Sequence, residues 1–527
     1  MSVTLETAAQ IGYTDKQKRE ALILSEDVLS VNGETMHKKF EDVIAEQGSL
    51  VYTNVGDSMV PVIREGNLLI IEAVKNPLKV GDVPLYKRDT GQYVLHRVVG
   101  IKNGKYMMKG DNRDFVERGI TDRYIIGVLT GIVRNGKTYP VETVQEFTAR
   151  VAGDLAYLVS CAVNEQTPDK ERVNSMDLAE VYRLSKMHQL TAAAAFGLEK
   201  LLMLPPTFDE EKKRAVANLT LFEAERAAVT RELETAGIWY LPLKGIVLKN
   251  LYPKSAMREM SDNDILVDSA KMEDVKQIMH SLGFSGGDYD KDHDVVFKKP
   301  PSVVFEMHNR LFEKQHHPLY FAYYKNIRQK LLPVQGTNCG FQMTNEDFYI
   351  YLICHMHKHY HYAGTGLRSL LDVYVFQKVH GETLDKDYLA AELKKLKLTG
   401  FEADMRRLAE KVFSDSPLSE QEKETFAFLA TSGTYGTGNR AMQYSIEKYI
   451  RDNNGKASKA KYILHRVFIP EKDVEKHYPF FYRHKLLYPV LPVYRLGTGL
   501  ARHPKQITQE YKAFKRVKKE IKRNDKV

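Results

Sequence analysis

The spacing of apolar residues divides the chain into regions of different secondary structure. Between residues 49 and 139, short runs rich in Val, Ile, Leu and Tyr alternate with Gly, Asn and Asp, which is typical of short β-strands joined by turns. The segments KNGK at 102–105 and RNGK at 134–137 each contain Asn-Gly, the strongest short signal for a β-hairpin. The pattern therefore predicts an all-β domain in this part of the chain.

Helical spacing is found on both sides of this β region. Residues 1–45 are polar, with candidate helices in KREALILSEDVLSV (18–31) and MHKKFEDVIAEQ (36–47). From about residue 142 to residue 235, apolar residues again recur every three or four positions. We expect the last helix of this group to end just before Gly237, because glycine is favoured immediately after a helix.

Strands and helices alternate after residue 237, and residues 345–450 return to a helical pattern. The expected strands are IWYLPL, DNDILV and SVVFEMHNRL, and the expected helices are KGIVLKNLYP and AKMEDVKQIMHSLGF. The predicted fold class is a multidomain α+β protein, in which a small all-β domain precedes an α/β core flanked by helical regions. Its expected parts are 1–45 (helical segment), 46–141 (β domain), 142–235 (helical region), 236–335 (α/β core), 336–460 (helical region) and 461–527 (basic, aromatic tail).

The composition limits the class of protein and its compartment. A chain of 527 residues with 43% hydrophobic and 28% charged residues has enough apolar material for several hydrophobic cores. Its three cysteines follow no pairing pattern, which favours a reducing compartment. No apolar leader follows Met1 and no run of 18 apolar residues occurs, so the sequence predicts a cytoplasmic protein.

Positive charge is concentrated at the C-terminal end. Of the net charge of +9, the segment 505–527 contributes +6, from nine Lys or Arg and three acids. The rest of the chain is nearly neutral, so no specific nucleic-acid partner is predicted. We expect an amphipathic helix docked on the body of the protein, with a weak contact to a membrane surface or to an acidic partner as the functional alternative. The apolar residues at helical spacing are Ile507, Tyr511, Phe514, Val517 and Ile521.

Three short segments of the β region carry chemically active side chains. They are GDSMVP (56–61), VLHRVVG (94–100) and KGDNRDFVERG (109–119). A serine hydroxyl is a weak nucleophile until a base takes its proton, and a histidine oriented by a carboxylate serves as such a base. Ser58, His96 and an acid of the third segment therefore form a candidate catalytic set.

The three segments resemble those of the serine peptidase superfamily that contains signal peptidase I and the self-cleaving repressors, in its Ser-His form. The resemblance covers about residues 45–140 and implies Ser58 as the nucleophile and His96 as the general base. Among the acids of the third segment we favour Asp111 as the partner of His96, with Asp114 and Glu117 as alternatives. The implied activities are cleavage of a peptide, self-cleavage, or binding of a peptide as an added strand.

A second pair of acids lies in SDNDILVD, where Asp262 and Asp264 are two residues apart on an expected strand. The period of a strand points both side chains to one face, about 7 Å apart. Two such carboxylates can share a pair of Mg²⁺ ions, or Mn²⁺ ions, as phosphoryl and nucleotidyl transfer require. Lys244-Gly245 at the start of an expected helix favours phosphate binding, and Glu306 on a later strand is a candidate third acid.

These segments resemble the uncharacterised nucleotidyltransferase family of the DNA polymerase beta superfamily, over roughly residues 150–500. The residues that carry the resemblance are Lys244-Gly245, Tyr252-Pro253, Arg258, DNDILV, Glu306-Met307-His308, His355, Lys358, His359, Gly366, Arg368 and Asp372. The resemblance implies metal ligands at Asp262, Asp264 and Glu306. It implies nucleotide contacts from Lys244, Gly245, Arg258, Lys358 and Arg368.

The histidines of HMHKHYHY (355–362) raise the alternative of a zinc site, because His355 and His359 share a helix face. No glutamate lies between them as in the helical zinc motif of metalloproteases. We therefore expect this helix to pack against the catalytic domain or to contact phosphate through Lys358 and Arg368.

Together, these features predict a Mg²⁺- or Mn²⁺-dependent nucleotidyltransferase fused to a Ser-His peptidase-like domain. It transfers a nucleoside monophosphate from a nucleoside triphosphate to an acceptor, a peptide or a small molecule, which the sequence does not identify. Two alternatives remain open. One is a peptidase in which the nucleotidyltransferase half only recognises the substrate, and the other is a non-catalytic binding scaffold.

Overall fold

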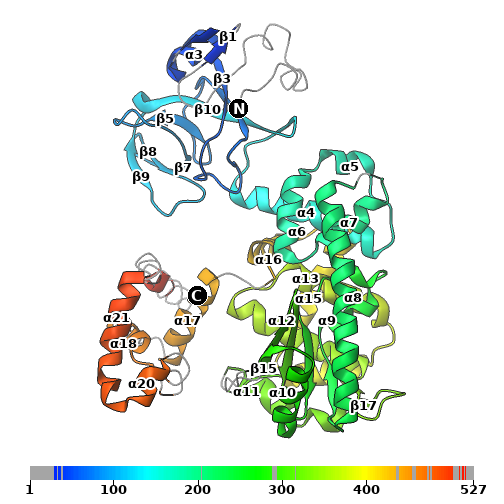
Figure 1. Cartoon of the computed structure of the whole chain (residues 1–527). Helices are drawn as coiled ribbons and strands as arrows, with labels where there is room; N and C mark the ends of the chain where they lie inside the picture. Colours follow the sequence, from blue (N-terminus) through cyan, green and yellow to red (C-terminus); the bar gives the residue numbers. More distant parts are fainter. Residues whose placement is uncertain are drawn as a thin grey trace. The chain divides into compact units, whose positions relative to one another are not determined.

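The computed structural model describes the chain from residue 29 to residue 517, apart from short gaps. The gaps are 32–33, 37–38, 203, 288–293, 315, 435–437, 454–457, 470, 472–473, 475–477, 503–509, 511–512 and 516. The chain divides into two compact units, Met1–Val151 and Ala152–Val527, and each is described by itself (Figure 1). No helix among the described residues is long and apolar enough to cross a lipid bilayer.

The first unit is built from antiparallel strands, and those between residues 49 and 139 form two sheets, as the rhythm of short apolar runs predicts. The larger sheet has the order β3 (Ser49–Thr53), β4 (Leu68–Glu72), β10 (Ile125–Arg134), β5 (Pro84–Lys87) and β6 (Tyr93–Leu95), and β11 (Lys137–Tyr139) pairs with β10. The smaller sheet has the order β7 (Arg97–Lys102), β8 (Lys105–Lys109) and β9 (Glu117–Ile120). The expected strand YVLHRVVGI is thus divided at His96, which lies between β6 and β7.

Both Asn-Gly pairs form the expected hairpin turns. Asn103 and Gly104 connect β7 to β8, and Asn135 and Gly136 connect β10 to β11. All four residues have positive φ, between 48° and 76°, as the tight turn that matches the twist of a hairpin requires.

The segment before these sheets differs in part from the prediction. The second expected helix is present as α3 (Phe40–Gln47). In contrast, Leu29–Val31, expected within the first helix, is strand β1 and pairs with β2 (Glu34–Met36). The sequence is compatible with strands here, because Val31 and Thr35 are β-branched and such residues are enriched in strands. Residues 18–28 of the first expected helix lie outside the described part of the chain.

Helices come first in the second unit, as predicted. They are α4 (Val144–Val163), which begins in the first unit, α5 (Lys170–Ser175), α6 (Leu178–His188), α7 (Thr191–Glu199) and α8 (Pro206–Thr235). The apolar pattern continues through residues 175–202, but the chain turns at Gln189, which has left-handed backbone angles (φ 51°, ψ 49°). Helix α8 ends before Gly237, whose φ is +65°, as expected.

A mixed five-stranded sheet follows, in the order β12 (Tyr240–Pro242), β13 (Asn263–Val267), β16 (Val303–His308), β15 (Asp294–Lys299) and β14 (Ser285–Gly286). Only β13 and β16 run parallel in this sheet. Ile265, Val267, Phe305 and Met307 point to one face of the sheet, where they pack with residues of α8 and α10 (Met272–Ser281). Since side chains alternate along a strand, the residues between them point to the opposite face.

The remaining described residues of this unit are mostly helical. Helices α12 (Asn345–Tyr362) and α13 (Leu367–His380) pack together, and α14 (Lys386–Lys395), α15 (Thr399–Phe413) and α16 (Glu420–Ser432) follow. The last described helices are α17 (Gly438–Asp452), α18 (Lys459–Val467), α20 (Pro479–Arg483) and α21 (Leu491–Arg502). Of the predicted tail helix, Phe514 and Val517 pack with α17 and α18, whereas Ile507, Tyr511 and Ile521 lie outside the described residues.

Candidate active sites

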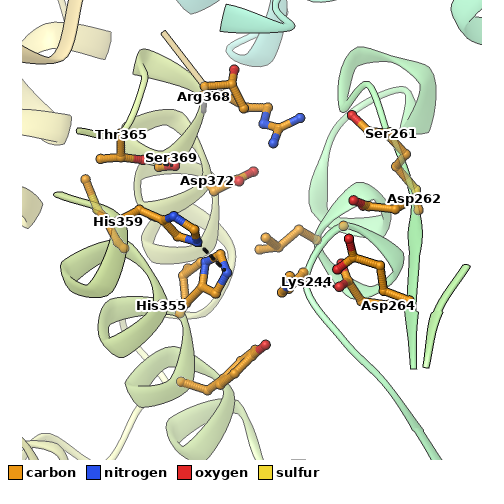
Figure 2. Close-up of a pocket in the computed structure, with 18 of the residues that line it drawn as sticks. Lys244, Ser261, Asp262, Asp264, His355, His359, Thr365, Arg368, Ser369 and Asp372 are labelled. Atoms are coloured by element: carbon orange, nitrogen blue, oxygen red, sulfur yellow. Dashed lines mark hydrogen bonds and ion pairs between the residues drawn. The ribbon is translucent and has the colours of Figure 1, made fainter. Parts of the chain in front are cut away.

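A cavity of about 310 Å³ lies against the sheet of the second unit. Its acidic wall consists of Asp262, Asp264 and Glu306, and residues of α12 and α13 line the opposite wall. Figure 2 shows Asp262 and Asp264 pointing into this space from one side and His355, His359 and Arg368 facing them from the other.

The register of the sheet brings the predicted acids together. Asp264 on β13 is the direct partner of Glu306 on the parallel strand β16. Both residues alternate with the buried apolar residues that face α8 and α10, so both side chains emerge on the face that carries the cavity. Asp262 lies two residues before Asp264 and lines the same cavity.

Asp264 is held as an ionised carboxylate by two donors. The Nζ of Lys244 lies 2.7 Å from its Oδ1, and the Nε2 of His308 lies 2.8 Å from the same oxygen. Burial alone would raise the pKa of Asp264, but the charge of Lys244 and the hydrogen bond from His308 bring it well below its ordinary value. Asp264 therefore keeps its negative charge at any physiological pH.

The two neighbouring acids are shifted in the opposite direction. Burial and the charge of Asp264 raise the pKa of Asp262, and the same two causes raise the pKa of Glu306 to about 8. Burial and neighbouring negative charge destabilise the ionised form of such a carboxylate, and a nearby cation stabilises that form again. The acidic wall is therefore electrostatically prepared for positive charge.

Lys244 is placed by an unusual backbone turn between β12 and the short helix α9 (Gly245–Leu248). Its φ of 46° and ψ of −119° lie in a region that favours glycine. Burial alone would lower the pKa of Lys244, but Asp264 raises it above the ordinary value, so the side chain stays charged. Gly245 also lines the cavity, and a Cβ there would lie 3.3 Å from Cγ of Met260.

Two histidines and a lysine of α12 face the cavity. The Nε2 atoms of His355 and His359 are 3.2 Å apart. Burial, together with neighbouring cations, lowers the pKa of His355 well below its ordinary value and that of His359 to about 3. Burial and the charge of Lys244 also lower the pKa of Lys358. The two imidazoles are therefore neutral, and the described part of the chain brings no third ligand to them within metal-binding distance.

Arg368 enters the cavity from the first turn of α13, beside the hydroxyls of Thr365 and Ser369, which are 2.7 Å apart. The loop before α13 is fixed by buried His188, whose Nδ1 accepts a hydrogen bond from the Leu367 amide at 3.1 Å. A Cβ on Gly366 would lie 2.6 Å from this Nδ1, so the close approach requires glycine.

Arg258, predicted to contact the nucleotide, also lines the cavity, but its guanidinium is engaged by protein groups. Its Nε and Nη2 donate to the two oxygens of Asp372 at 2.7 and 2.9 Å, and Nη1 donates to the Glu259 carbonyl at 2.8 Å. The Tyr252 hydroxyl donates to Asp372 at 2.7 Å. The guanidinium is thus used to join the loop before β13 to α13, because a buried arginine requires a carboxylate partner.

Sequence reasoning assigned no role in the cavity to Ser261 and Asp294, nor to His308, which is named only as part of the family resemblance. His308 follows Glu306 by two residues on an expected strand, so strand alternation could have placed it on the same face. Asp294 begins β15, which pairs with β16 and brings Asp294 opposite His308. The short segment DVVFKK carries the alternation of a strand, and this signal could have found it.

The donor set of the acidic wall fits a divalent cation. Carboxylate oxygens are the ligands that Mg²⁺ and Mn²⁺ prefer. The raised pKa values of Asp262 and Glu306 show that their ionised forms would be stabilised by a nearby cation. Among the described residues, Asp264, Glu306 and His308 each place one ligand atom within 4.8 Å of the others.

The second candidate site lies in the first unit, where His96 is buried between the two sheets. Its Nδ1 is 3.1 Å from Oε1 of Glu117 and 3.3 Å from the Tyr86 hydroxyl. Burial alone would raise the pKa of Glu117, but hydrogen bonds from Arg88 and Tyr86 lower it. Burial lowers the pKa of His96 more than the charge of Glu117 raises it. His96 is therefore a neutral imidazole next to an ionised carboxylate.

The expectation that Asp111 supports His96 is wrong. Nε and Nη2 of Arg97 donate to the two oxygens of Asp111 at 2.9 and 2.7 Å. Glu117, one of the two alternatives, takes the predicted place. The register of the smaller sheet explains this arrangement. Arg97 pairs with Lys109 at the end of β8, so Asp111, two residues further on, lies next to Arg97. Strand β9 then runs back along β8 and pairs Glu117 with Met108, which brings Glu117 to His96.

Ser58 and His96 meet around Gly110. A Cβ on Gly110 would lie 2.7 Å from the Ser58 carbonyl oxygen and 2.9 Å from Nε2 of His96. The amide of Asn112 donates to the same Ser58 carbonyl at 2.8 Å. The segments around residues 58, 96 and 110 are thus joined at one place, with Nε2 of His96 on the side of Ser58 and Nδ1 on the side of Glu117.

The two units define two classes of protein. A mixed sheet with acids on adjacent strands beneath a partly basic helical wall is the arrangement of a nucleotidyltransferase-like domain. A small β domain that assembles a serine, a histidine and a carboxylate is the arrangement of a serine peptidase-like domain.

Comparison with known families agrees with both assignments. Residues 174–414 match the model of a family described as uncharacterised nucleotidyltransferase, and residues 10–130 match the model of a family described as peptidase S24-like. The chain therefore carries a peptidase S24-like domain followed by a nucleotidyltransferase-like domain, in the order that the sequence predicts. No curated protein matches the chain.

Proposed function

We propose that the second unit transfers a nucleoside monophosphate from a nucleoside triphosphate to a small acceptor or a peptide. The observation that carries the proposal is the meeting of Asp262, Asp264 and Glu306 on one wall of a cavity whose other wall bears Lys358 and Arg368. Negative and positive walls on either side of one space fit a ligand that combines divalent cations with phosphates.

Different residues of the cavity would bind the metal ion, bind the phosphates and accept the proton. Asp262 and Asp264 would hold a divalent cation, with Glu306 as a third ligand or as the base that takes the acceptor proton. Such an ion, when bound, neutralises phosphate oxygens and activates the acceptor oxygen. Lys358 and Arg368 would bind phosphate oxygens, and Arg368 does so best because its guanidinium offers several donors in a fixed geometry. Lys244 keeps Asp264 ionised.

The test is labelling of a cell extract by α-³²P-labelled nucleoside triphosphates, with the full chain and Mg²⁺ or Mn²⁺. We expect label to appear on an acceptor with the unaltered protein and to disappear with Asp262→Asn and Asp264→Asn. Asp274→Asn is the matched control, since Asp274 is an exposed acid on α10 outside the cavity. Labelling that survives both cavity substitutions would exclude this site as its source.

A second activity, hydrolysis of a peptide bond at Ser58, is supported by the position of Glu117 at Nδ1 of His96. A proton on Nδ1 directed at Glu117 leaves the lone pair on Nε2, on the side of Ser58. His96 would then take the Ser58 proton as the hydroxyl attacks the peptide carbonyl, and Glu117 would stabilise the imidazolium that forms.

A serine-directed phosphonate tests this second activity. We expect the full chain to form one adduct at Ser58, seen as a mass shift of a single peptide, and Ser58→Ala and His96→Gln to form none. Ser49→Ala, in strand β3, is the control for a general loss of labelling. If the unaltered protein forms no adduct while it remains folded, Ser58 is not an activated nucleophile and the first unit binds peptides without cutting them.

A further inference from the structure

One cation is already built into the acidic wall of the nucleotidyltransferase-like domain, the ammonium of Lys244 (Figure 2). Its Nζ and the Nε2 of His308 both contact Oδ1 of Asp264, at 2.7 and 2.8 Å. A carboxylate oxygen has two lone pairs, so these two donors use both. A metal ion on Asp264 therefore has to bind Oδ2 or displace a donor.

The backbone of Lys244 indicates that this position is not incidental. Its φ of 46° and ψ of −119° are angles that an L-residue adopts only with backbone strain. Glycine would adopt them without strain, yet the chain has lysine here and glycine at the next position. Since the Lys244 side chain reaches Asp264, the strained turn serves to place a positive charge inside the cavity.

The charges around the cavity also argue against two resident metal ions. Arg258 and Asp372 neutralise each other. The other charged lining residues are four acids and three bases, with a formal net charge of −1 when all seven are ionised, namely Asp262, Asp264, Asp294, Glu306, Lys244, Lys358 and Arg368. One divalent ion changes this net charge to +1 and a second would change it to +3. The second ion would thus bind against a surplus of positive charge.

We infer that Lys244 replaces one ion of a two-ion site, so that the cavity takes a single divalent cation, held by Asp262 and Oδ2 of Asp264. Ions of a two-ion site lie about 3.5–4 Å apart and share a carboxylate, and the ammonium of Lys244 lies on the carboxylate that would be shared. This inference rests on the proposed nucleotidyl transfer and adds the number of ions and the role of Lys244.

The number of bound Mn²⁺ ions tests the inference without any measurement of activity. The full chain is titrated with Mn²⁺ in the presence of the non-hydrolysable α,β-methylene analogue of ATP, and bound ions are counted by electron paramagnetic resonance. We expect one ion in the unaltered protein and in Lys244→Arg. We expect two ions, with spin–spin coupling between them, in Lys244→Met. Lys358→Met, which removes a cavity lysine elsewhere, should keep one ion.

Two further points make the result decisive. Lys244→Gly removes the same charge and relieves the backbone strain, so it provides a folded variant if Lys244→Met does not fold. Two ions in the unaltered protein, or one ion in both Lys244→Met and Lys244→Gly, would overturn the role of Lys244 and leave the transfer proposal standing. No bound ion in any variant would overturn the transfer proposal itself.

An independent observation concerns the surface of α20, α21 and the 3₁₀ segment Lys485–Val490 between them. Large apolar side chains are exposed there: Phe480, Leu486, Leu487, Val490, Val493 and Leu496. Leu486 is 95% exposed and Val493 is 71% exposed, values that a soluble surface rarely shows in one short segment. Residues 479–502 also contain four arginines or lysines and no acid. We call residues 479–502 the C-terminal apolar surface.

We propose that the C-terminal apolar surface rests on a membrane that contains anionic lipids. Leu486, Val490 and Val493 are exposed within eight residues of one another, and such a group of apolar side chains beside cations is typical of a segment that lies in a membrane interface. Arg483 and Lys485 are exposed beside them and would pair with lipid phosphates. An acidic protein would account for the cations but leave the leucines in water, so a lipid surface fits both features.

Sedimentation with vesicles tests this proposal on the full chain. We expect binding to phosphatidylcholine vesicles that contain phosphatidylglycerol, little binding to pure phosphatidylcholine, and about a tenfold or greater loss in Leu486→Glu/Val493→Glu. Leu202→Glu is the matched control, since Leu202 is also 95% exposed but lies elsewhere. Absent binding, equal binding to both vesicles, or unchanged binding of the double variant would overturn the proposal. So would a change in oligomeric mass of the double variant without a change in lipid binding, because a second copy would then cover the surface.

Discussion

The contact between Arg258 and Asp372 provides the sharpest prediction on the stability of the second unit. Their side chains are 8% and 4% exposed, and two hydrogen bonds at 2.7 and 2.9 Å join them. Tyr252 adds a third hydrogen bond to Asp372. The contact joins the loop before β13 to α13, so it fixes the two walls of the cavity relative to each other.

Asp372→Ala leaves a buried guanidinium without its carboxylate. Removal of one partner of a buried ion pair costs about 3–5 kcal/mol, and we expect the free energy of unfolding of this unit to fall by that amount. The control is Asp404→Ala, which removes a carboxylate 2.6 Å from Arg407, because both of those side chains are 55% exposed. An exposed pair of this kind contributes less than about 1 kcal/mol.

Urea denaturation measured by tryptophan fluorescence is a suitable assay, because Trp239 is the only tryptophan of the chain and lies next to β12. The double variant Arg258→Met/Asp372→Leu should recover part of the loss, since an apolar pair replaces a buried ion pair at little cost. The reasoning is refuted if Asp372→Ala loses no more stability than Asp404→Ala.

Three further outcomes follow from the two candidate sites. Burial and the charge of Asp264 raise the pKa of Glu306 to about 8 in the absence of an ion. If Glu306 is the base, the rate of transfer should therefore rise with pH to a plateau, with an inflection at pH 8 or below that moves lower as Mn²⁺ is added. Glu306→Gln should abolish this dependence on pH. Because burial lowers the pKa of His96 from its ordinary value, phosphonate labelling of Ser58 should stay constant from alkaline to neutral pH. It should fall only at a more acidic pH than the one that protonates an exposed histidine. Gly110→Ala should reduce the rate of phosphonate labelling about a hundredfold or more, because its Cβ would lie 2.9 Å from Nε2 of His96. Circular dichroism should show that the first unit remains folded. An unchanged labelling rate would show that the close approach at Gly110 is unimportant.

The parts of the structure that the sequence predicted are those set by local rules. Turns at Asn103-Gly104 and Asn135-Gly136 depend on backbone angles that few residues adopt. The shared cavity of Asp262 and Asp264 follows from the alternation of side chains in an extended chain, although Asp262 lies one residue before β13. Both features are encoded within a few residues, so a single sequence suffices to predict them.

The features that sequence reasoning missed depend on strand register and on contacts over long distances in the chain. Glu117 reaches His96 only because β9 folds back on β8. Asp372 meets Arg258 across 114 residues. Periodicity shows which face of an element is apolar but not which element it meets, so it could place Asp111, Asp114 and Glu117 in one segment without deciding among them.

The two candidate sites share one electrostatic arrangement, in which an ionised carboxylate lies beside a neutral titratable group. Each has one carboxylate that a cation keeps ionised, Glu117 beside Arg88 and Asp264 beside Lys244. Each also has a neighbouring group that burial keeps in its neutral form, His96 in the first site and Glu306 in the second. Two titratable groups with pKa values moved apart are what acid–base chemistry near neutral pH requires. A purely structural ion pair needs only the first of these conditions. The presence of the second condition at both sites is therefore the strongest physical argument that each is built for chemistry.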